Sequence, residues 1–163
     1  AGTYPLPAAQ LDRFFMKLSL GYPDAQQERA MLTAYQLQSP LNSLAPVCAG
    51  QDILEVQKQV AQVRVSQPVA AYIVSLAGAT RRHEKIRLGI SPRGVIALMR
   101  ASQAKAAMQG RDYVLPDDVK SVFWYISAHR IICRGYQMGQ ADDVAKECLS
   151  EILVQTPAPV EQQ

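Results

Sequence analysis

The sequence has few cysteines and histidines, and this scarcity limits the chemistry it can support. Its three cysteines, Cys48, Cys133 and Cys148, are widely spaced and form no Cys-x-x-Cys motif, so neither a disulfide framework nor a metal site is expected. We interpret them as reduced thiols that pack as small hydrophobic side chains. The two histidines, His83 and His129, stand in no metalloprotease motif, and no Gly-x-Ser-x-Gly motif of a serine hydrolase occurs.

The short motifs that bind phosphate groups are also missing. No glycine is followed by lysine, which excludes the Gly-x-x-x-x-Gly-Lys-Ser/Thr loop, and no Gly-x-Gly-x-x-Gly motif is present. No apolar run ends in Asp-Glu, the carboxylate pair that would hold magnesium beside such a loop. We therefore expect no ATP hydrolysis, no bound cofactor and no bound metal from these 163 residues by themselves.

Charge and long apolar runs are scarce as well. Charged residues make up 19% of the chain and the net charge is +3, which does not suggest a general coat for nucleic acid. No apolar run approaches the roughly 20 residues of a membrane span. The chain begins Ala-Gly-Thr-Tyr, with neither Met nor a signal-peptide pattern, and we interpret it as a piece of a longer, soluble, cytoplasmic protein.

The residues that are present favour a mainly α-helical fold. In the first part, alternation over residues 14–20 predicts a strand, Asp24 begins a predicted helix over about 24–38, and a shorter helix follows over about 51–61. Residues 62–65 alternate and are compatible with a short extended segment. A lone strand cannot pair its own edges, so either residues 10–20 pair with other short segments of this chain, or their partner strands belong to something larger.

The second part, residues 66–153, predicts a bundle of amphipathic helices. Ser66 can cap the first helix, Ser91 followed by Pro92 begins a second that stops at Gly110, and Pro116 begins a third, which runs to about residue 130. A last helix is predicted over about 140–154, and residues 154–163 form a polar, proline-rich tail that we expect to be flexible. The apolar positions of the first three helices recur at the spacing of one buried face; they are Val69, Tyr72, Ile73 and Leu76, then Val95, Leu98 and Met99, then Val119, Val122, Phe123 and Ile126.

Two blocks of sequence resemble a known family. Residues 2–23 (GTYPLPAAQLDRFFMKLSLGYP) are similar to the stretch after the sensor-1 strand of MoxR-type AAA+ ATPases, and residues 89–131 (GISPRGVIALMRASQAKAAMQGRDYVLPDDVKSVFWYISAHRI) resemble the helical lid of the same family. The resemblance extends to about residue 153. It implies that residues 1–65 end the AAA+ core, that residues 66–153 form the lid, and that the fold is a helical lid bundle preceded by a short strand–helix remnant.

The resemblance also implies roles for individual residues. Arg13 of the Leu-Asp-Arg-Phe motif is similar to an arginine finger, which reaches the ATP of a neighbouring subunit. Arg93 of Ser-Pro-Arg is similar to sensor 2, with Ser91 and Pro92 beside it at the nucleotide. A guanidinium suits both roles because it is always charged and offers a planar set of donors to phosphate oxygens. Considered without the family, Arg13 could equally form a local ion pair with Asp12, and Arg93 could be a solvated residue of a first helical turn.

The function implied by the resemblance is the lid of an ATPase that binds ATP and Mg²⁺. The parent would form a ring, expected to be hexameric, and drive chaperone-like remodelling or maturation of other proteins, with a von Willebrand factor A domain protein as a possible partner. One alternative is a helical module that binds nucleic acid through residues 81–93 and the following helix, although the basic run 81–87 (RRHEKIR) within it also suits a solvated linker. The other alternative is a protein-interaction bundle with no nucleotide role. The family usually has Thr before Pro116, where this chain has Leu115, so the side-chain cap of the third predicted helix is missing. We also expect apolar surface that parts outside this chain would normally cover to favour self-association of the chain.

Overall fold

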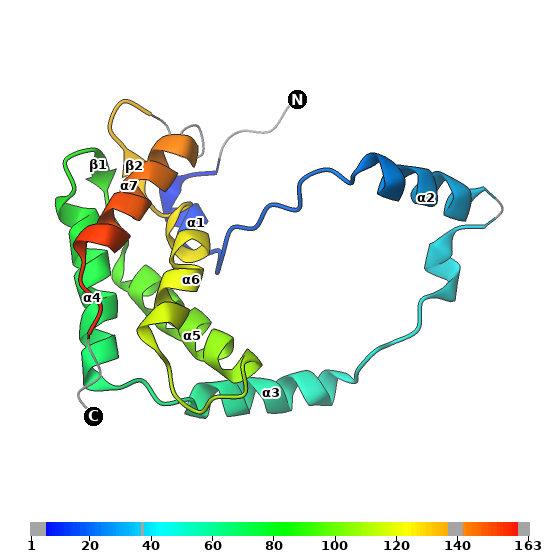
Figure 1. The fold of residues 1–163 in the computed structure, drawn as a ribbon, viewed down its shortest axis with the longest axis horizontal. Helices are drawn as coiled ribbons and strands as arrows, with labels where there is room; N and C mark the ends of the chain where they lie inside the picture. Colours follow the sequence, from blue (N-terminus) through cyan, green and yellow to red (C-terminus); the bar gives the residue numbers. More distant parts are fainter. Residues whose placement is uncertain (1–5, 37, 137–141, 160–163) are drawn as a thin grey trace. The chain divides into compact units, whose positions relative to one another are not determined.

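The computed structural model describes residues 6–36, 38–136 and 142–159, and these form a mainly α-helical structure with one two-stranded sheet (Figure 1). The helices are α1 (Ala8–Leu11), α2 (Ala25–Tyr35), the 3₁₀ helix η1 (Pro40–Ser43), α3 (Gly50–Gln62), α4 (Gln67–Arg82), α5 (Pro92–Met108), α6 (Pro116–Ser127) and α7 (Asp142–Gln155). The strands are β1 (Ile86–Leu88) and β2 (Ile132–Cys133). The predicted fold class, a helical bundle with little sheet, is confirmed.

The described residues divide into two compact units. One contains the residues up to Lys17 together with those from Lys58 onward, and the other contains Leu18–Gln57. The boundary between the units falls within α3, whereas the sequence suggested a division after residue 65. The assignment of residues 1–65 to the end of an AAA+ core stays a prediction.

The core of the larger unit lies between α4, α5, α6 and α7. The predicted apolar face of α4 is buried, with Leu76 fully inaccessible to solvent, and the same holds for Leu98 of α5 and Phe123 of α6. Ser66 and Ser91 accept hydrogen bonds from backbone amides of the first turns of α4 and α5, as their positions predicted. Gly110 follows α5 with a φ of +74°, a left-handed conformation that glycine adopts at helix ends at little cost. The predicted helical periodicity is therefore confirmed in this unit.

The small sheet was not predicted. β1 pairs with β2 in antiparallel orientation, with Ile86 opposite Cys133 and an irregularity before Leu88 reaches Ile132. β1 arises from the basic run, where Ile86 is the single apolar residue between charged neighbours, yet Ile86 is buried. The run is therefore not a solvated linker throughout its length, because one of its residues belongs to the core.

The predicted strand over residues 14–20 is wrong. Residues 12–15 form a turn and a bend, and residues 16–20 pair with no strand in the described structure. The alternation of apolar and polar residues in this segment satisfies the period of a strand, but a strand also needs a neighbour to accept its backbone hydrogen bonds. Within residues 16–20, the backbone amide of Lys17 donates to the carbonyl of Tyr125 at 2.8 Å.

The smaller unit, Leu18–Gln57, has helices without a core of its own. Asp24 caps α2 as predicted, and its carboxylate accepts from the amides of Gln26 and Gln27 while the Gln27 side chain accepts from the Asp24 amide. The helix is shorter than the predicted 24–38, and α3 agrees with the predicted 51–61 to within one residue at each end. Neither α2 nor α3 contains a buried residue.

The C-terminal part agrees with the sequence analysis where the structure describes it. α7 begins at Asp142 and ends at Gln155, against a prediction of about 140–154, whose first two residues lie outside the described part. Of the predicted tail, residues 160–163 also lie outside it. Ala158 is partly buried against the core, so the beginning of this tail packs on the larger unit. α6 ends at Ser127, before the predicted end near residue 130, and residues 128–130 form a turn.

Candidate functional site

Arg13, the predicted arginine finger, lies in the turn that follows α1. Its amide donates to the carbonyl of Gln10 at 3.1 Å, which fixes the backbone of the turn. The side chain is exposed and makes no hydrogen bond or ion pair with any residue that the structure describes. The alternative interpretation, a local ion pair with Asp12, is not what the structure contains. The guanidinium of Arg13 is thus available for a ligand or a neighbouring molecule.

Arg93, the predicted sensor 2, lies in the first turn of α5. Ser91 is the N-cap of this helix, with its hydroxyl oxygen 3.2 Å from the amide of Gly94, and Pro92 occupies the first helical position, where its missing amide costs nothing. The Arg93 side chain is 59% exposed and its Nη1 lies 3.9 Å from Oδ2 of Asp12. This is a long ion pair at the surface, and it leaves most donors of the guanidinium unused.

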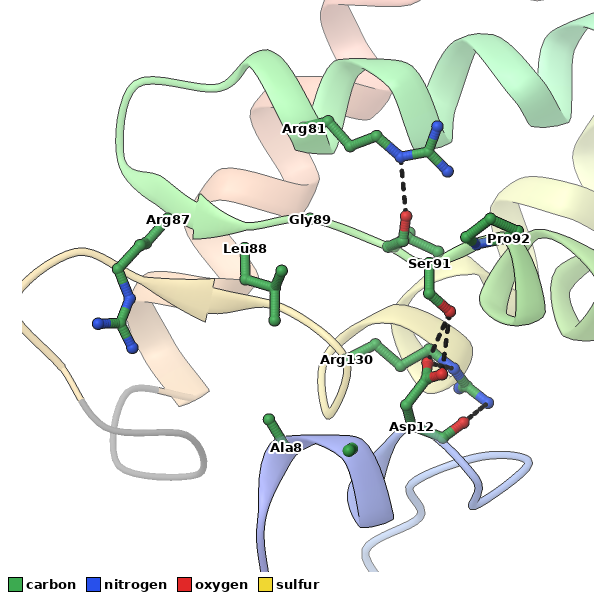
Figure 2. Close-up of a pocket in the computed structure, with 11 residues that line it drawn as sticks. Ala8, Asp12, Arg81, Arg87, Leu88, Gly89, Ser91, Pro92 and Arg130 are labelled. Carbon is green, nitrogen blue, oxygen red and sulfur yellow. Dashed lines mark hydrogen bonds and ion pairs between the residues drawn. The ribbon is translucent and has the colours of Figure 1, made fainter.

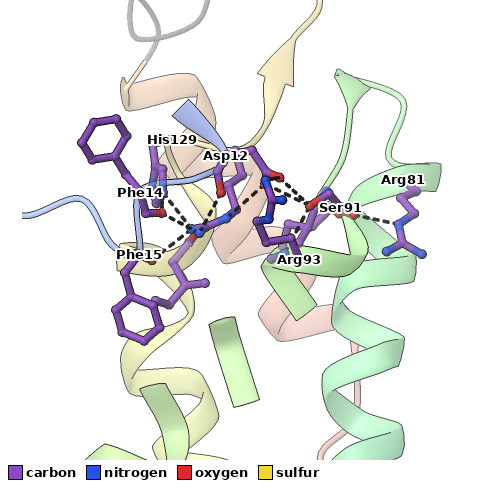
Figure 3. A network of polar contacts seen from close by, with 12 residues as sticks. Asp12, Phe14, Phe15, Arg81, Ser91, Arg93 and His129 are labelled. Atoms are coloured by element: carbon purple, nitrogen blue, oxygen red, sulfur yellow. Dashed lines mark hydrogen bonds and ion pairs between the residues drawn. The ribbon is translucent and has the colours of Figure 1, made fainter. Parts of the chain in front are cut away.

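Asp12 brings the two predicted motifs together. Its carboxylate accepts from the hydroxyl of Ser91 at 2.9 and 3.0 Å, across 79 residues of sequence, and it faces the guanidinium of Arg93 as well (Figure 3). The Leu-Asp-Arg-Phe and Ser-Pro-Arg motifs are therefore neighbours within one compact unit. The Ser91 hydroxyl makes two interactions: it accepts from the amide of Gly94 and so caps α5, and it donates to the carboxylate of Asp12.

Arg130 completes this network and was missed by the sequence analysis. It lies in the turn after α6, is only 3% exposed, and its Nε is 3.3 Å from Oδ1 of Asp12, close enough for an ion pair although the hydrogen-bond geometry is poor. Burial lowers the pKa of this guanidinium, while the Asp12 carboxylate acts in the opposite direction. The signal in the sequence is the His-Arg-Ile triplet at residues 129–131, which ends the second block that resembles the family. The resemblance implies no role for its arginine.

The other nitrogens of Arg130 bind backbone carbonyls of the turn that carries Arg13. Nη2 donates to Phe14 at 2.6 Å and to Asp12 at 3.3 Å, and Nη1 donates to Phe15 at 3.1 Å (Figure 3). Nη1 also donates to the carbonyl of Ile126 in the last turn of α6. One buried side chain thus satisfies carbonyls of two segments that are more than 100 residues apart in the sequence.

His129 borders the same network. Its Nε2 lies 3.0 Å from the carbonyl of Phe14 and 2.7 Å from Nη1 of Arg130, and its Nδ1 is buried without a hydrogen-bond partner in the described part of the chain. Burial is the main reason that the pKa of His129 is lowered, and the charge of Arg130 adds to this; the Phe14 carbonyl opposes it. The imidazole is therefore held neutral, and His129 has a packing role.

A pocket of about 600 Å³ opens beside these residues. Figure 2 shows Asp12, Ser91, Pro92 and Arg130 at one side and Arg81 at the other, where Nε of Arg81 donates to the carbonyl of Ile90 at 2.9 Å. Ser91 and Pro92, both predicted to lie at the nucleotide, thus line a concave surface.

The basic run 81–87 is partly engaged within the protein. Lys85 pairs with Glu147 at 2.8 Å and with Glu151 at 3.4 Å, and His83 lies 3.1 Å from Glu151. Arg81 donates to a carbonyl, and the side chains of Arg82 and Arg87 are exposed. The alternative in which this part of the chain binds nucleic acid stays a prediction.

The residues present fit a phosphate group better than a metal ion. Two exposed guanidinium groups are available, those of Arg13 and Arg93, and both can donate to phosphate oxygens. Among the described residues, no group of three or more His, Cys, Asp or Glu side chains could hold a metal ion. Within the same described part, none of the helices has the length and apolar character needed to cross a bilayer.

Comparisons with known proteins agree with this description. Residues 78–151 match the family of the AAA lid domain. The chain is 40% identical to the YeaC protein of Bacillus subtilis over 94% of its length and 31% identical to the chaperone MoxR1 of Mycobacterium tuberculosis over 96% of its length. The fold matches a crystal structure of a "putative ATPase" from Cytophaga hutchinsonii with a TM-score of 0.84, at 31% identity and over 98% of the chain.

The family match shows that residues 78–151 form an AAA lid domain. The chain as a whole is similar to MoxR-type AAA+ proteins, since it aligns with two relatives named MoxR over almost its entire length. It spans about half the length of these relatives, 43% of MoxR1 and 51% of the MoxR protein of Methylorubrum extorquens. It likewise covers 51% of the Cytophaga chain.

Proposed function

We propose that this chain is the part of an ATP-hydrolysing AAA+ machine that presents two arginines, Arg13 and Arg93, to the phosphates of ATP. The observation that carries the proposal is the Asp12 bridge, which joins the turn of Arg13 to the first turn of α5 while both guanidinium groups remain exposed. The MoxR relatives and the lid domain support the class of activity.

ATP supplies the phosphoryl group that is transferred to water, and the chain's own residues supply charge and position. Negative charge redistributes over the phosphate oxygens as the transferred group leaves, so a guanidinium within hydrogen-bond distance stabilises the transition state. Arg13 would act as the arginine finger and Arg93 as sensor 2. Ser91 and Pro92 would fix the first turn of α5 and so set the direction of Arg93.

The phosphates must be brought to this surface by residues outside this chain, because the sequence contains no phosphate-binding loop. A head-to-tail ring provides such an arrangement, since each subunit then offers one surface to the ATP of its neighbour. We propose a hexameric ring of identical subunits that binds ATP with Mg²⁺. A chaperone-like action on other proteins extends the proposal and is supported by the name of the MoxR1 relative. The cytoplasmic location and the von Willebrand factor A domain partner rest on the family resemblance of the sequence alone.

ATP turnover by the full-length protein that carries this sequence tests the proposal. Arg13→Ala is expected to lower kcat by about 10³-fold or more, the effect typical of an arginine finger, and Arg93→Ala is expected to lower it as well. The matched control is Arg29→Ala, which removes an exposed arginine of α2 and should leave turnover unchanged. Wild-type turnover in both Arg13→Ala and Arg93→Ala would contradict the proposed roles.

A further inference from the structure

Arg130 occupies an unusual position for a charged residue. It is 3% exposed, and its guanidinium lies between the turn after α1 and the last turn of α6. A buried charge is costly unless it is paired and its donors are satisfied. Here Nη1 and Nη2 donate to four backbone carbonyls and the charge faces Asp12, whereas Nε makes no hydrogen bond. The cost is therefore offset mainly by contacts to one particular segment.

That segment is the turn at residues 12–15, which we call the 12–15 loop. Three of its four residues accept hydrogen bonds from Arg130 through their carbonyl oxygens; the fourth is Arg13, whose side chain is exposed. Arg130 therefore holds the backbone of the loop at the residues on both sides of Arg13. Other contacts also hold the loop: the Arg13 amide donates to the Gln10 carbonyl, and the Asp12 carboxylate accepts from Ser91. Arg130 is the side chain that contacts three of its four carbonyls.

The same guanidinium also acts on α5 through Asp12. The carboxylate of Asp12 faces Arg130 at 3.3 Å and accepts from Ser91 at 2.9 Å, and Ser91 caps the helix that carries Arg93. Gly94 leaves room for this arrangement, because a Cβ atom at that position would lie 2.9 Å from Cδ of Arg130 and 2.4 Å from Cγ2 of Ile90. α5 thus packs directly against the aliphatic part of Arg130.

We propose that Arg130 is a positioning residue, which clamps the 12–15 loop and, through Asp12, the start of α5, so that Arg13 and Arg93 are presented from one rigid surface. The clamp consists only of contacts within this chain. Its consequence for catalysis rests on the proposed function, because it requires Arg13 to act on phosphate. The two parts are tested by different measurements.

Trypsin digestion of the 163-residue chain tests the clamp. The peptide bond after Arg13 can be cleaved only when the 12–15 loop leaves its place, so its cleavage rate reports local opening. Replacing Arg130 by Met retains a long apolar side chain and removes every donor, and we expect cleavage after Arg13 to increase about tenfold or more. Cleavage after Arg29, in the other compact unit, serves as the internal reference and should not change.

Arg130→Lys keeps the test decisive if Arg130→Met fails to fold, and Ser91→Ala and Arg134→Met serve as controls. Arg130→Lys retains a positive charge beside Asp12 but has one amino group in place of the planar donor set, so intermediate protection is expected. Ser91→Ala cuts the link from Asp12 to α5 without exposing or burying a charge, and it should leave the bond after Arg13 protected. Arg134→Met, the same substitution at an exposed arginine four residues later, should also leave it protected. Wild-type protection in a folded Arg130→Met or Arg130→Lys chain would overturn the clamp.

ATP turnover by the full-length protein tests the catalytic consequence. A misplaced finger weakens contacts made in the transition state, so Arg130→Lys is expected to lower kcat about tenfold or more with KM nearly unchanged. If cleavage after Arg13 rises while kcat stays at the wild-type value, the positioning role is wrong although the clamp exists. If Arg13→Ala itself leaves kcat unchanged, the proposed function fails, and the trypsin result still decides the clamp.

Discussion

The imidazole of His129 is buried beside a guanidinium, which makes the stability of the larger unit depend on pH. Burial and the charge of Arg130 lower the pKa of His129, with Lys17 acting in the same direction and with Asp12 and the Phe14 carbonyl opposing them. In the unfolded chain a histidine has a pKa of about 6.5. Because the folded pKa is the lower of the two, the unfolded state takes up more protons, and stability falls as the pH drops below about 6.5.

This dependence gives a prediction for His129→Gln. The wild-type chain should lose free energy of unfolding between pH 7 and pH 5, and the variant should lose less over the same range because it has no proton to take up at this site. Urea denaturation at both pH values measures the difference. Carboxylates titrate in both proteins and cancel in the comparison. Equal losses in the two proteins would show that His129 contributes nothing to the pH dependence.

Single residues of the site were predictable only where a short motif contained them. Arg13 and Arg93 were named from Leu-Asp-Arg-Phe and Ser-Pro-Arg, and the structure places the two motifs together, although the roles themselves stay predictions. Arg130 could not be named because its importance depends on which carbonyls surround it. Three of the four carbonyls belong to residues more than 110 positions earlier in the chain.

At the scale of elements, α6 begins without a side chain that can accept from its first amides. Leu115 is the N-cap and makes no side-chain cap hydrogen bond, although the carboxylate of Asp118 accepts from the Leu115 amide at 2.8 Å. Asp118 is itself held by Arg111, with Nη2 to Oδ1 at 2.6 Å. The helix therefore has half of a capping box, and the missing half is the one that threonine would supply.

We accordingly predict that Leu115→Thr stabilises the chain, by up to about 1 kcal/mol, because its hydroxyl can accept from an amide of the first turn. The measurement is the urea midpoint of unfolding. Leu115→Val is the matched control, since valine has the shape of threonine and no acceptor. If the two variants have the same midpoint, the added hydroxyl does not cap α6.

Elements were predictable where the local pattern and the tertiary contacts agree. Helices α4, α5 and α6 each bury the face that their periodicity marked, because a helix satisfies its backbone hydrogen bonds internally and needs only one surface to pack against. Strands need a neighbour, and this is why both errors concern them. Residues 14–20 have the period of a strand without a partner, while β1 has a partner in β2 without a clear period.

At the scale of the molecule, burial differs sharply between the two compact units. The larger unit has fully buried residues such as Leu76, whereas the smaller unit exposes its large apolar side chains. In that unit these are Leu18, Leu20, Tyr22, Met31, Leu32, Tyr35, Leu41, Leu44, Val47, Ile53, Leu54 and Val56. Exposed apolar surface of this kind favours association with other surfaces, so self-association of the isolated chain stays a prediction.

The contrast predicts different costs for the same substitution. Leu76→Ala removes a side chain with no exposed surface and should lower the free energy of unfolding by about 2–5 kcal/mol. Leu32→Ala, at a leucine that is 75% exposed on α2, should change it by no more than about 0.5 kcal/mol. Chemical denaturation of the two variants in parallel measures both effects. Comparable losses would mean that α2 contributes to the cooperative core.

The sequence by itself determined the helical class of this protein, the first residues of its main helices, and the motifs that relate it to MoxR-type proteins. These properties depend on periodicity, on capping residues and on short runs of neighbours. The tertiary structure decided the rest: the pairing of β1 with β2, the bridge from Asp12 to Ser91, and the burial of Arg130. Each of these joins residues far apart in the chain, and contacts of that kind are fixed by packing, which no local pattern encodes.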